Sequence, residues 1–107
     1  MGRGTTGGRR RVGMAVVRGA SMTPALRPGQ RLLVVYGAPV RAGKVVVARF
    51  ADGTLAVKRA AERRAGGWWL LSDNAAAGVD SRHRGVVPDD DVAGVVRARL
   101  WPWPRLL

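Results

Sequence analysis

The stretch that decides the fold covers residues 44–60 and reads KVVVARFADGTLAVKRA. Its central Asp-Gly pair is typical of a tight turn between two strands, so we predict that 44–50 and 55–60 pair as an antiparallel hairpin. Outside this hairpin, short apolar runs bounded by glycine and proline predict more strands. These further strands are expected at 13–18, 30–36, 68–71 and 92–100.

The remaining segments indicate turns and loops, because they show neither strand nor helix periodicity. Many short strands without a long helix favour a mainly β domain, built either as a barrel or as two packed sheets. We predict a flexible basic tail at 1–12 and a single domain with one core at 13–107. The predicted turns and loops are 62–67, 75–85 and 88–91.

Composition excludes several chemistries. The 107-residue chain has no cysteine and one histidine, so we expect no disulfide, no thiol catalysis and no metal site built from thiolates or imidazoles. We therefore predict neither a metal nor a cofactor. A net charge of +12 would suit a nucleic-acid partner, but the basic residues are scattered along the chain, so no specific nucleic-acid binding is predicted.

The apolar runs of the sequence are all of strand length. The longest, 32–36 and 45–48, fall far short of the roughly 20 residues that a membrane-spanning helix needs. We therefore expect a cytoplasmic protein without a transmembrane anchor, for which peripheral contact with a membrane remains an option.

A candidate nucleophile lies in the run GASMTPA at residues 19–25. The apolar segment 14–18 precedes it as a predicted strand, and Pro24 favours a turn or a first helical position. Ser21 is therefore expected at the end of a strand with its backbone N–H free. A serine hydroxyl attacks a carbonyl only if a neighbouring base takes its proton.

Two kinds of base are available in this sequence. His83 lies between two arginines, which disfavour its protonated form, so it is a poor candidate. A lysine with its usual pKa of about 10.4 is neutral in only about one molecule in 2,500 at pH 7, but burial can lower that pKa by roughly 3 to 5 units. Lys58 shares its strand face with alanines and suits such burial, whereas Lys44 stands at a strand start. That Lys58 is merely an edge lysine extending to solvent stays open.

Three segments in order resemble the conserved boxes of the type I signal peptidase family. Residues 17–34 resemble the serine box, 57–59 the lysine box, and 72–74 together with 80–88 the closing box. The resemblance implies the compact β fold shared by signal peptidases and SOS-repressor-like self-cleaving domains, with several short antiparallel strands. It also implies that Ser21 is the nucleophile, that Lys58 is the general base, and that the Ser21 N–H binds the oxyanion.

The resemblance extends to residues around the dyad. A substrate would lie extended between the strand that ends at Gly19 and the strand at 55–60, with a shallow pocket for a small side chain such as alanine. Many relatives carry hydroxyls where this chain has Gly19 and Gly78, so Lys58 needs another orienting group. Expected at the substrate are Val17, Gly19, Met22, Leu26, Ala56 and Val57. Expected as structural supports are Asp73, Asn74, Asp80, Ser81 and Arg82, with an ion pair between Asp80 and Arg82.

The short spacing between the lysine box and the closing box, the small size and the WPWP run at 101–104 are similar to the peptidases that mature nickel-type superoxide dismutase. The partner would then be a precursor or its leader peptide. One alternative is a signal-peptidase-like enzyme that processes exported proteins at a membrane, with Trp101 and Trp103 as interface anchors, although we expect these tryptophans to cap the barrel. A self-cleaving repressor is disfavoured, because no DNA-binding domain or linker precedes Ser21. A non-catalytic basic binding module is the alternative from another class.

Overall fold

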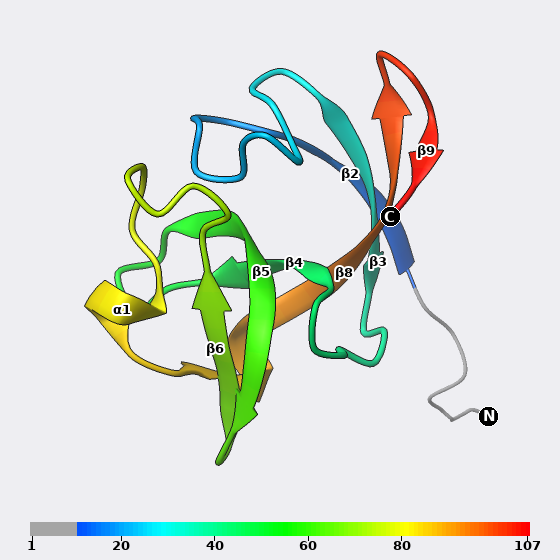
Figure 1. The fold of residues 1–107 in the computed structure, drawn as a ribbon. Coiled ribbons are helices and arrows are strands. Elements are labelled where there is room, and N and C mark those ends of the chain that lie inside the picture. The colour runs from blue at the N-terminus through cyan, green and yellow to red at the C-terminus, as the bar shows by residue number, and fades with distance from the viewer. Residues whose placement is uncertain (1–10) are drawn as a thin grey trace, which may run out of the picture.

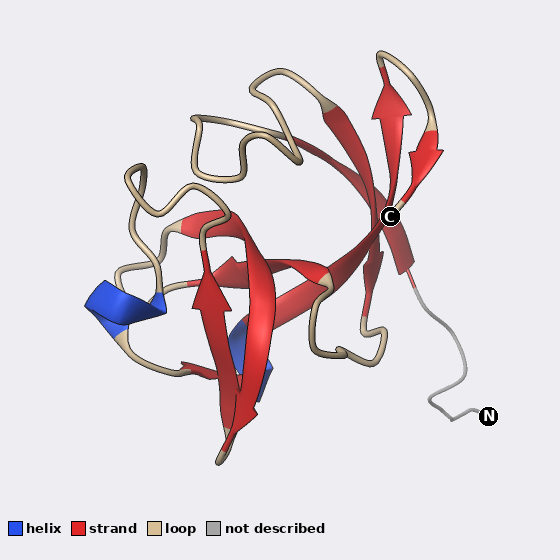
Figure 2. Cartoon of the chain, in the orientation of Figure 1, coloured by secondary structure: helices blue, strands red, loops and turns tan. Residues whose placement is uncertain are grey.

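The computed structural model describes residues 11–107, which form one curled antiparallel sheet (Figure 1). Strands dominate and the helices are short, so the predicted mainly β class is confirmed (Figure 2). The spatial order is β2-β3-β8-β4-β5-β6-β7, and β9 pairs with β8. The strands are β2 (Arg11–Val16), β3 (Arg31–Tyr36), β4 (Val45–Arg49), β5 (Leu55–Arg64), β6 (Gly67–Leu71), β7 (Val87–Pro88), β8 (Val92–Trp101) and β9 (Arg105–Leu106).

The hairpin predicted at 44–60 is present. Strands β4 and β5 pair antiparallel, with Val47 opposite Val57, and the Phe50 N–H donates to the Thr54 carbonyl at 2.9 Å to close the turn. Gly53 has a φ of +87°, a conformation that favours glycine. The Asp-Gly pair therefore fixes the turn that carries the chain into the strand of Lys58.

The turn predicted at 62–67 is much shorter in the structure, because β5 continues to Arg64 and β6 already begins at Gly67. Two arginine–tryptophan stacks extend this ladder. The Arg63 guanidinium lies 5.6 Å from the centre of the Trp68 ring, and that of Arg64 lies 4.0 Å from the Trp69 ring. These cross-strand contacts stabilise residues whose polar side chains alone indicate a turn.

The loop predicted at 75–85 contains a short helix, α1 (Ser81–Arg84), and the predicted turn at 88–91 contains a single 3-10 turn at Asp89–Asp91. Four residues are too few to show helical periodicity in a sequence. The buried Asp80 caps α1, its carboxylate accepting from the Arg82 N–H at 3.0 Å. Local side-chain capping, not an apolar face, therefore forms this helix.

Two apolar clusters lie on opposite faces of the curled sheet, and β8 contributes to both. Val95 packs in the cluster that contains Phe50 and Leu70, whereas its neighbour Val96 packs in the cluster with Met22. The second cluster anchors the segment between β2 and β3, which carries Ser21. Of residues 1–12, the predicted tail, 1–10 lie outside the described residues, and Arg11 and Val12 begin β2.

Among residues 11–107, the structure contains no helix of the length and apolar character that would let it cross a membrane.

Candidate active site

Ser21 lies in the segment 17–30, which leaves β2 and returns as β3. Backbone hydrogen bonds join the two ends of this segment. The Val17 N–H donates to the Gln30 carbonyl, and the Gly29 N–H donates to the Val17 carbonyl, both at 2.8 Å. Met22 is only 1% exposed and anchors the turn in the core. In the described part of the chain the Ser21 N–H donates to no backbone carbonyl, so it remains available to a bound group.

Lys58 lies on β5 and is only 3% exposed. Its Nζ donates a hydrogen bond of 3.0 Å to the Ser72 hydroxyl, which is also buried. Burial lowers the pKa of the Lys58 ammonium below the ordinary value of 10.5, and the negative charge of Asp80 opposes part of that change. The amine is therefore biased toward the neutral form that a general base requires.

Gly78 marks the point where the serine and the lysine meet. A Cβ built on Gly78 would lie 2.9 Å from Ser21 Cβ, 3.6 Å from Ser21 Oγ and 3.2 Å from Lys58 Nζ. The two reactive atoms therefore border the same small space, although they lie on segments 37 residues apart in the sequence. Gly78 has no side chain to occupy that space, and its φ of +77° is a backbone conformation that favours glycine.

A β-bulge decides which residue faces Lys58. Next to the turn of the β5–β6 hairpin Arg63 pairs with Trp68, but beyond Ala61 the register shifts by one residue, so that Ala60 pairs with Leu70. Continued one step past the Arg59–Leu71 pair, this register places Ser72 opposite Lys58. Without the extra residue, the same continuation would place Asp73 there. Bulges often redirect a side chain beside a functional site in this way.

Asp80 is a buried hydrogen-bond acceptor next to Ser72, the residue that faces Lys58. It is completely buried, and its carboxylate accepts from the Ser72 N–H at 2.9 Å and from the Arg82 guanidinium at 2.7 and 3.0 Å. Burial alone would raise the pKa of Asp80, but these hydrogen bonds hold it below its usual range. The predicted Asp80–Arg82 ion pair is thus present. Ser81 connects α1 to β6, because its hydroxyl accepts a hydrogen bond from the Leu70 N–H at 2.8 Å.

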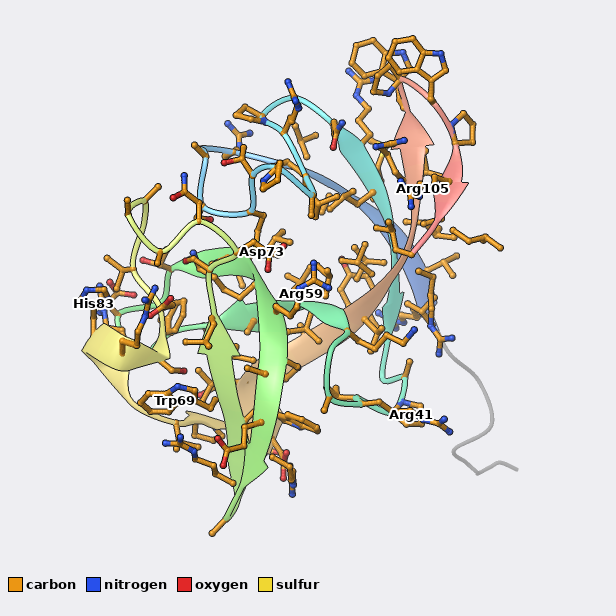
Figure 3. The ribbon with its side chains drawn as sticks, in the orientation of Figure 1. Arg41, Arg59, Trp69, Asp73, His83 and Arg105 are labelled. Atoms are coloured by element: carbon orange, nitrogen blue, oxygen red, sulfur yellow. The ribbon has the colours of Figure 1, made fainter. Side chains whose placement is uncertain are left out.

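Asn74 ties the loop after β6 to the serine turn. Its N–H donates to the Ser21 carbonyl at 2.8 Å, and its side-chain amide donates to Thr23 Oγ1 at 3.3 Å. Asp73 instead points to Arg59, with which it forms a two-bond ion pair at 2.7 and 2.8 Å (Figure 3). Asn74 therefore supports the position of Ser21 directly, and Asp73 supports β5.

An open groove of about 580 Å³ runs from the serine and the lysine toward the turn of the β4–β5 hairpin. It lies between two strand edges that pair with no other described strand, one on β2 and one on the first half of β5. Of the residues expected at a substrate, five line the groove: Val17, Gly19, Met22, Ala56 and Val57. Leu26 does not line it, and packs in the apolar cluster with Val17 and Met22.

The groove is longer than the shallow pocket that the sequence suggested. Beyond the predicted residues it is lined by Met14, Val16, Phe50 and Leu55. Met14 and Val16 are 57% and 40% exposed, so this strand presents apolar side chains to solvent along the groove. The alternation of apolar residues along β2 was the signal in the sequence that could have revealed this extension.

Two other candidate bases lie away from the serine. His83 is on the outer side of α1, where its side chain is 55% exposed and its Nδ1 accepts from the Asp80 N–H (Figure 3). Lys44 is exposed before β4. No cluster of three or more potential metal-ligating side chains (His, Cys, Asp or Glu) occurs within residues 11–107.

Residues 2–96 match the Peptidase S24-like family. The chain belongs to this family. The family lies in a Ser/Lys peptidase clan that includes both LexA-like and signal-peptidase-like proteins, so S24-like membership supports serine peptidase activity in general terms. A search of curated proteins found no match. The S24-like match covers Ser21, Lys58, Ser72 and Asp80, and hence the whole of the site described above.

Proposed function

We propose that this S24-like protein is a serine endopeptidase in which Ser21 and Lys58 form a catalytic dyad. The observation that carries the proposal is the buried Lys58 amine beside Gly78, where Ser21 also lies, at the end of an open apolar groove. Burial favours the neutral amine, and the groove admits an extended peptide whose main chain pairs with the free strand edges.

The chemistry follows from these positions. Neutral Lys58 takes the proton of the Ser21 hydroxyl as Oγ attacks the scissile carbonyl, and the Ser21 N–H donates to the resulting oxyanion. The Lys58 ammonium then gives its proton to the leaving amine, and the carbon–nitrogen bond breaks. Water, deprotonated by the same amine, hydrolyses the acyl-enzyme and restores the serine. Gly19 has no side-chain donor, so the second oxyanion donor must come from elsewhere.

For the substrate, we propose the leader of a precursor protein, with nickel-type superoxide dismutase as the first candidate. The sequence resemblance to the peptidases that mature this dismutase supports that choice. The exposed apolar side chains along the groove suit a segment with several apolar residues. In this proposal the protein works in the cytoplasm without a metal or cofactor of its own.

The test is incubation of the purified protein with the dismutase precursor and, separately, with a library of extended peptides, both read by mass spectrometry. We expect cleavage by the wild type, and loss of roughly a thousandfold or more in Ser21→Ala and Lys58→Ala. Lys44→Ala, which removes an exposed lysine, serves as the matched control and should stay active. Cleavage of library peptides but not of the precursor would contradict the proposed substrate and would still support the dyad. Undiminished cleavage by either dyad variant would overturn the dyad.

A non-catalytic basic binding module is the alternative from another class, and the net charge of +12 favours it. It predicts no cleavage of any peptide. It also predicts nucleic-acid affinity that falls steeply with salt and does not change in Ser21→Ala or Lys58→Ala. Both outcomes can be read from the same set of purified variants.

A further inference from the structure

The end of β8 and strand β9 form a hairpin that projects from the body of the sheet (Figure 1). We call residues 100–106 the tryptophan hairpin. Its large apolar side chains do not cap the sheet, contrary to our expectation, because most of their surface is open to solvent. The exposed fractions are 41% for Leu100, 55% for Trp101, 74% for Trp103 and 86% for Leu106. Apolar exposure this dense on one short hairpin marks a contact surface.

The charge around the tryptophan hairpin has one sign. All seven acidic residues of the chain lie between positions 52 and 91, so the segments 11–51 and 92–107 contain ten basic residues and no acidic one. These two segments form β2, β3, β4, β8 and β9. The side of the sheet that bears the tryptophan hairpin is therefore uniformly positive, whereas the other part of the domain is close to neutral.

Arginines lie directly against the tryptophans. The Arg31 guanidinium is 5.6 Å from the centre of the Trp101 ring, and Arg99 Nε donates to the Trp103 carbonyl at 2.7 Å. Arg105, on β9, pairs with Arg99 across the hairpin (Figure 3). Tryptophans with arginines at their base combine an apolar end with a cationic support, which is the side-chain pattern of proteins that lie at the membrane interface.

Cross-strand pairing connects the tryptophan hairpin to the edge of the groove. Val16 on β2 pairs with Arg31 on β3, and Arg31 pairs with Trp101 on β8. Paired residues project to the same side of a sheet, and two strand spacings amount to about 10 Å. Val16 is among the residues that line the groove, so Trp101 lies two strands away from the groove's β2 edge.

We propose that the tryptophan hairpin binds the surface of an anionic lipid membrane, with its tryptophan and leucine side chains at headgroup depth and its arginines on lipid phosphates. Exposed leucines beside the tryptophans favour lipid over nucleic acid, because aliphatic side chains gain from contact with acyl chains but do not stack on bases. The positive side of the sheet matches the negative membrane surface. This inference does not depend on the proposed peptidase activity.

The experiment is sedimentation of the full chain with vesicles of phosphatidylcholine alone and with vesicles that also contain phosphatidylglycerol. We expect binding to the anionic vesicles only, weakened by salt, with a blue shift of tryptophan fluorescence. The double variant Trp101→Ala/Trp103→Ala should lose roughly tenfold or more in affinity. Trp69→Phe, on β6, is the matched control and should bind like the wild type.

Three results would overturn the proposal. Absence of binding to anionic vesicles would do so, as would equal binding by the double variant. The third result is that the wild type does not bind vesicles and instead uses the tryptophans to associate with itself or to bind a short DNA or RNA. Circular dichroism of the double variant establishes that it is folded, which we expect because both side chains are exposed.

Discussion

Ser72 accepts a hydrogen bond from a lysine that has almost no access to water. In the proposed dyad this bond holds the Lys58 amine in one orientation, and the bond from the Ser72 N–H to Asp80 holds the serine itself. Ser72 touches the base and not the substrate, so it is a positioning residue. It supplies the orienting group that the glycine at position 78 does not.

Replacing Ser72 with alanine should lower kcat roughly 10- to 100-fold, because Lys58 becomes charged as it takes the serine proton and a hydrogen bond to a charged group contributes about 1.5–3 kcal/mol. KM should change little, since Ser72 does not line the groove. Ser72→Thr keeps the hydroxyl and should recover most of the rate. Steady-state kinetics on one peptide substrate measure all three variants. An equal loss in the alanine and threonine variants would show that Ser72 only fills space.

Gly78 borders both reactive side chains, so adding one methyl group there should disturb them. We expect Gly78→Ala to lose roughly 100-fold in kcat, because a Cβ would lie 2.9 Å from Ser21 Cβ. Gly53→Ala is the matched control: it has a similar φ of +87° but no atom within 4 Å of the added Cβ. Both variants should lose about 1 kcal/mol of stability from the positive φ. A similar kcat in the two variants would contradict this role for Gly78.

At the scale of elements, the loop and helix after β6 hold the site together. Asp80 caps α1, accepts from the Ser72 N–H just after β6 and pairs with Arg82, so one carboxylate ties α1 to the residue that orients Lys58. Because the pKa of Asp80 is held low, its stabilising charge is present at neutral pH and is lost only as the pH falls below its usual range.

Asp80→Asn should destabilise the protein by about 2–4 kcal/mol, because the new amide places a donor among groups that donate to it. Urea denaturation at neutral pH measures this loss. Glu62→Gln is the control, since the Glu62–Arg64 pair is exposed and should contribute no more than about 1 kcal/mol. Comparable stability losses in the two variants would contradict the central role of Asp80.

The same elements explain what the sequence could and could not predict. The Asp-Gly pair at 52–53 acts locally, so the hairpin was predictable from neighbouring residues alone. The bulge at Ala61 was not, because it is a property of how β5 pairs with β6 and no local residue signal marks it. Since the bulge decides whether Ser72 or Asp73 faces Lys58, the partner of the lysine could be found only from the structure.

At the scale of the whole molecule, the proposed site lies where segments from both apolar clusters come together. The turn with Ser21 packs in the cluster that contains Met22, whereas the strand with Lys58 packs through Ala60 in the other cluster and through Val57 against the first. Strands β4 and β8 contribute to both clusters and hold them together. The two residues come to border the same space beside Gly78 only when the whole domain is folded, which is why sequence order alone did not establish their proximity.

The buried lysine should make stability depend on pH. Because burial lowers the pKa of Lys58 from 10.5, the unfolded chain binds more protons between the folded pKa and 10.5, so the free energy of unfolding should rise with pH there. We expect the wild type to gain about 1.4 kcal/mol relative to Lys58→Met for each unit of that lowering. Urea denaturation at several pH values measures the difference. Lys44→Met is the control. If the difference in free energy of unfolding between the wild type and Lys58→Met did not vary with pH, the burial of a neutral amine would be contradicted.

The most direct test of the central claim is the pH dependence of kcat/KM for peptide cleavage, measured from about pH 5 to about pH 10. If neutral Lys58 is the base, kcat/KM should rise roughly tenfold per pH unit on the acid side. It should then level off below the ordinary lysine value of 10.5. Lys58→Ala should be inactive throughout. A flat profile, a rate that still climbs at the ordinary lysine pKa, or the same profile in Lys58→Ala would contradict the proposed role of Lys58.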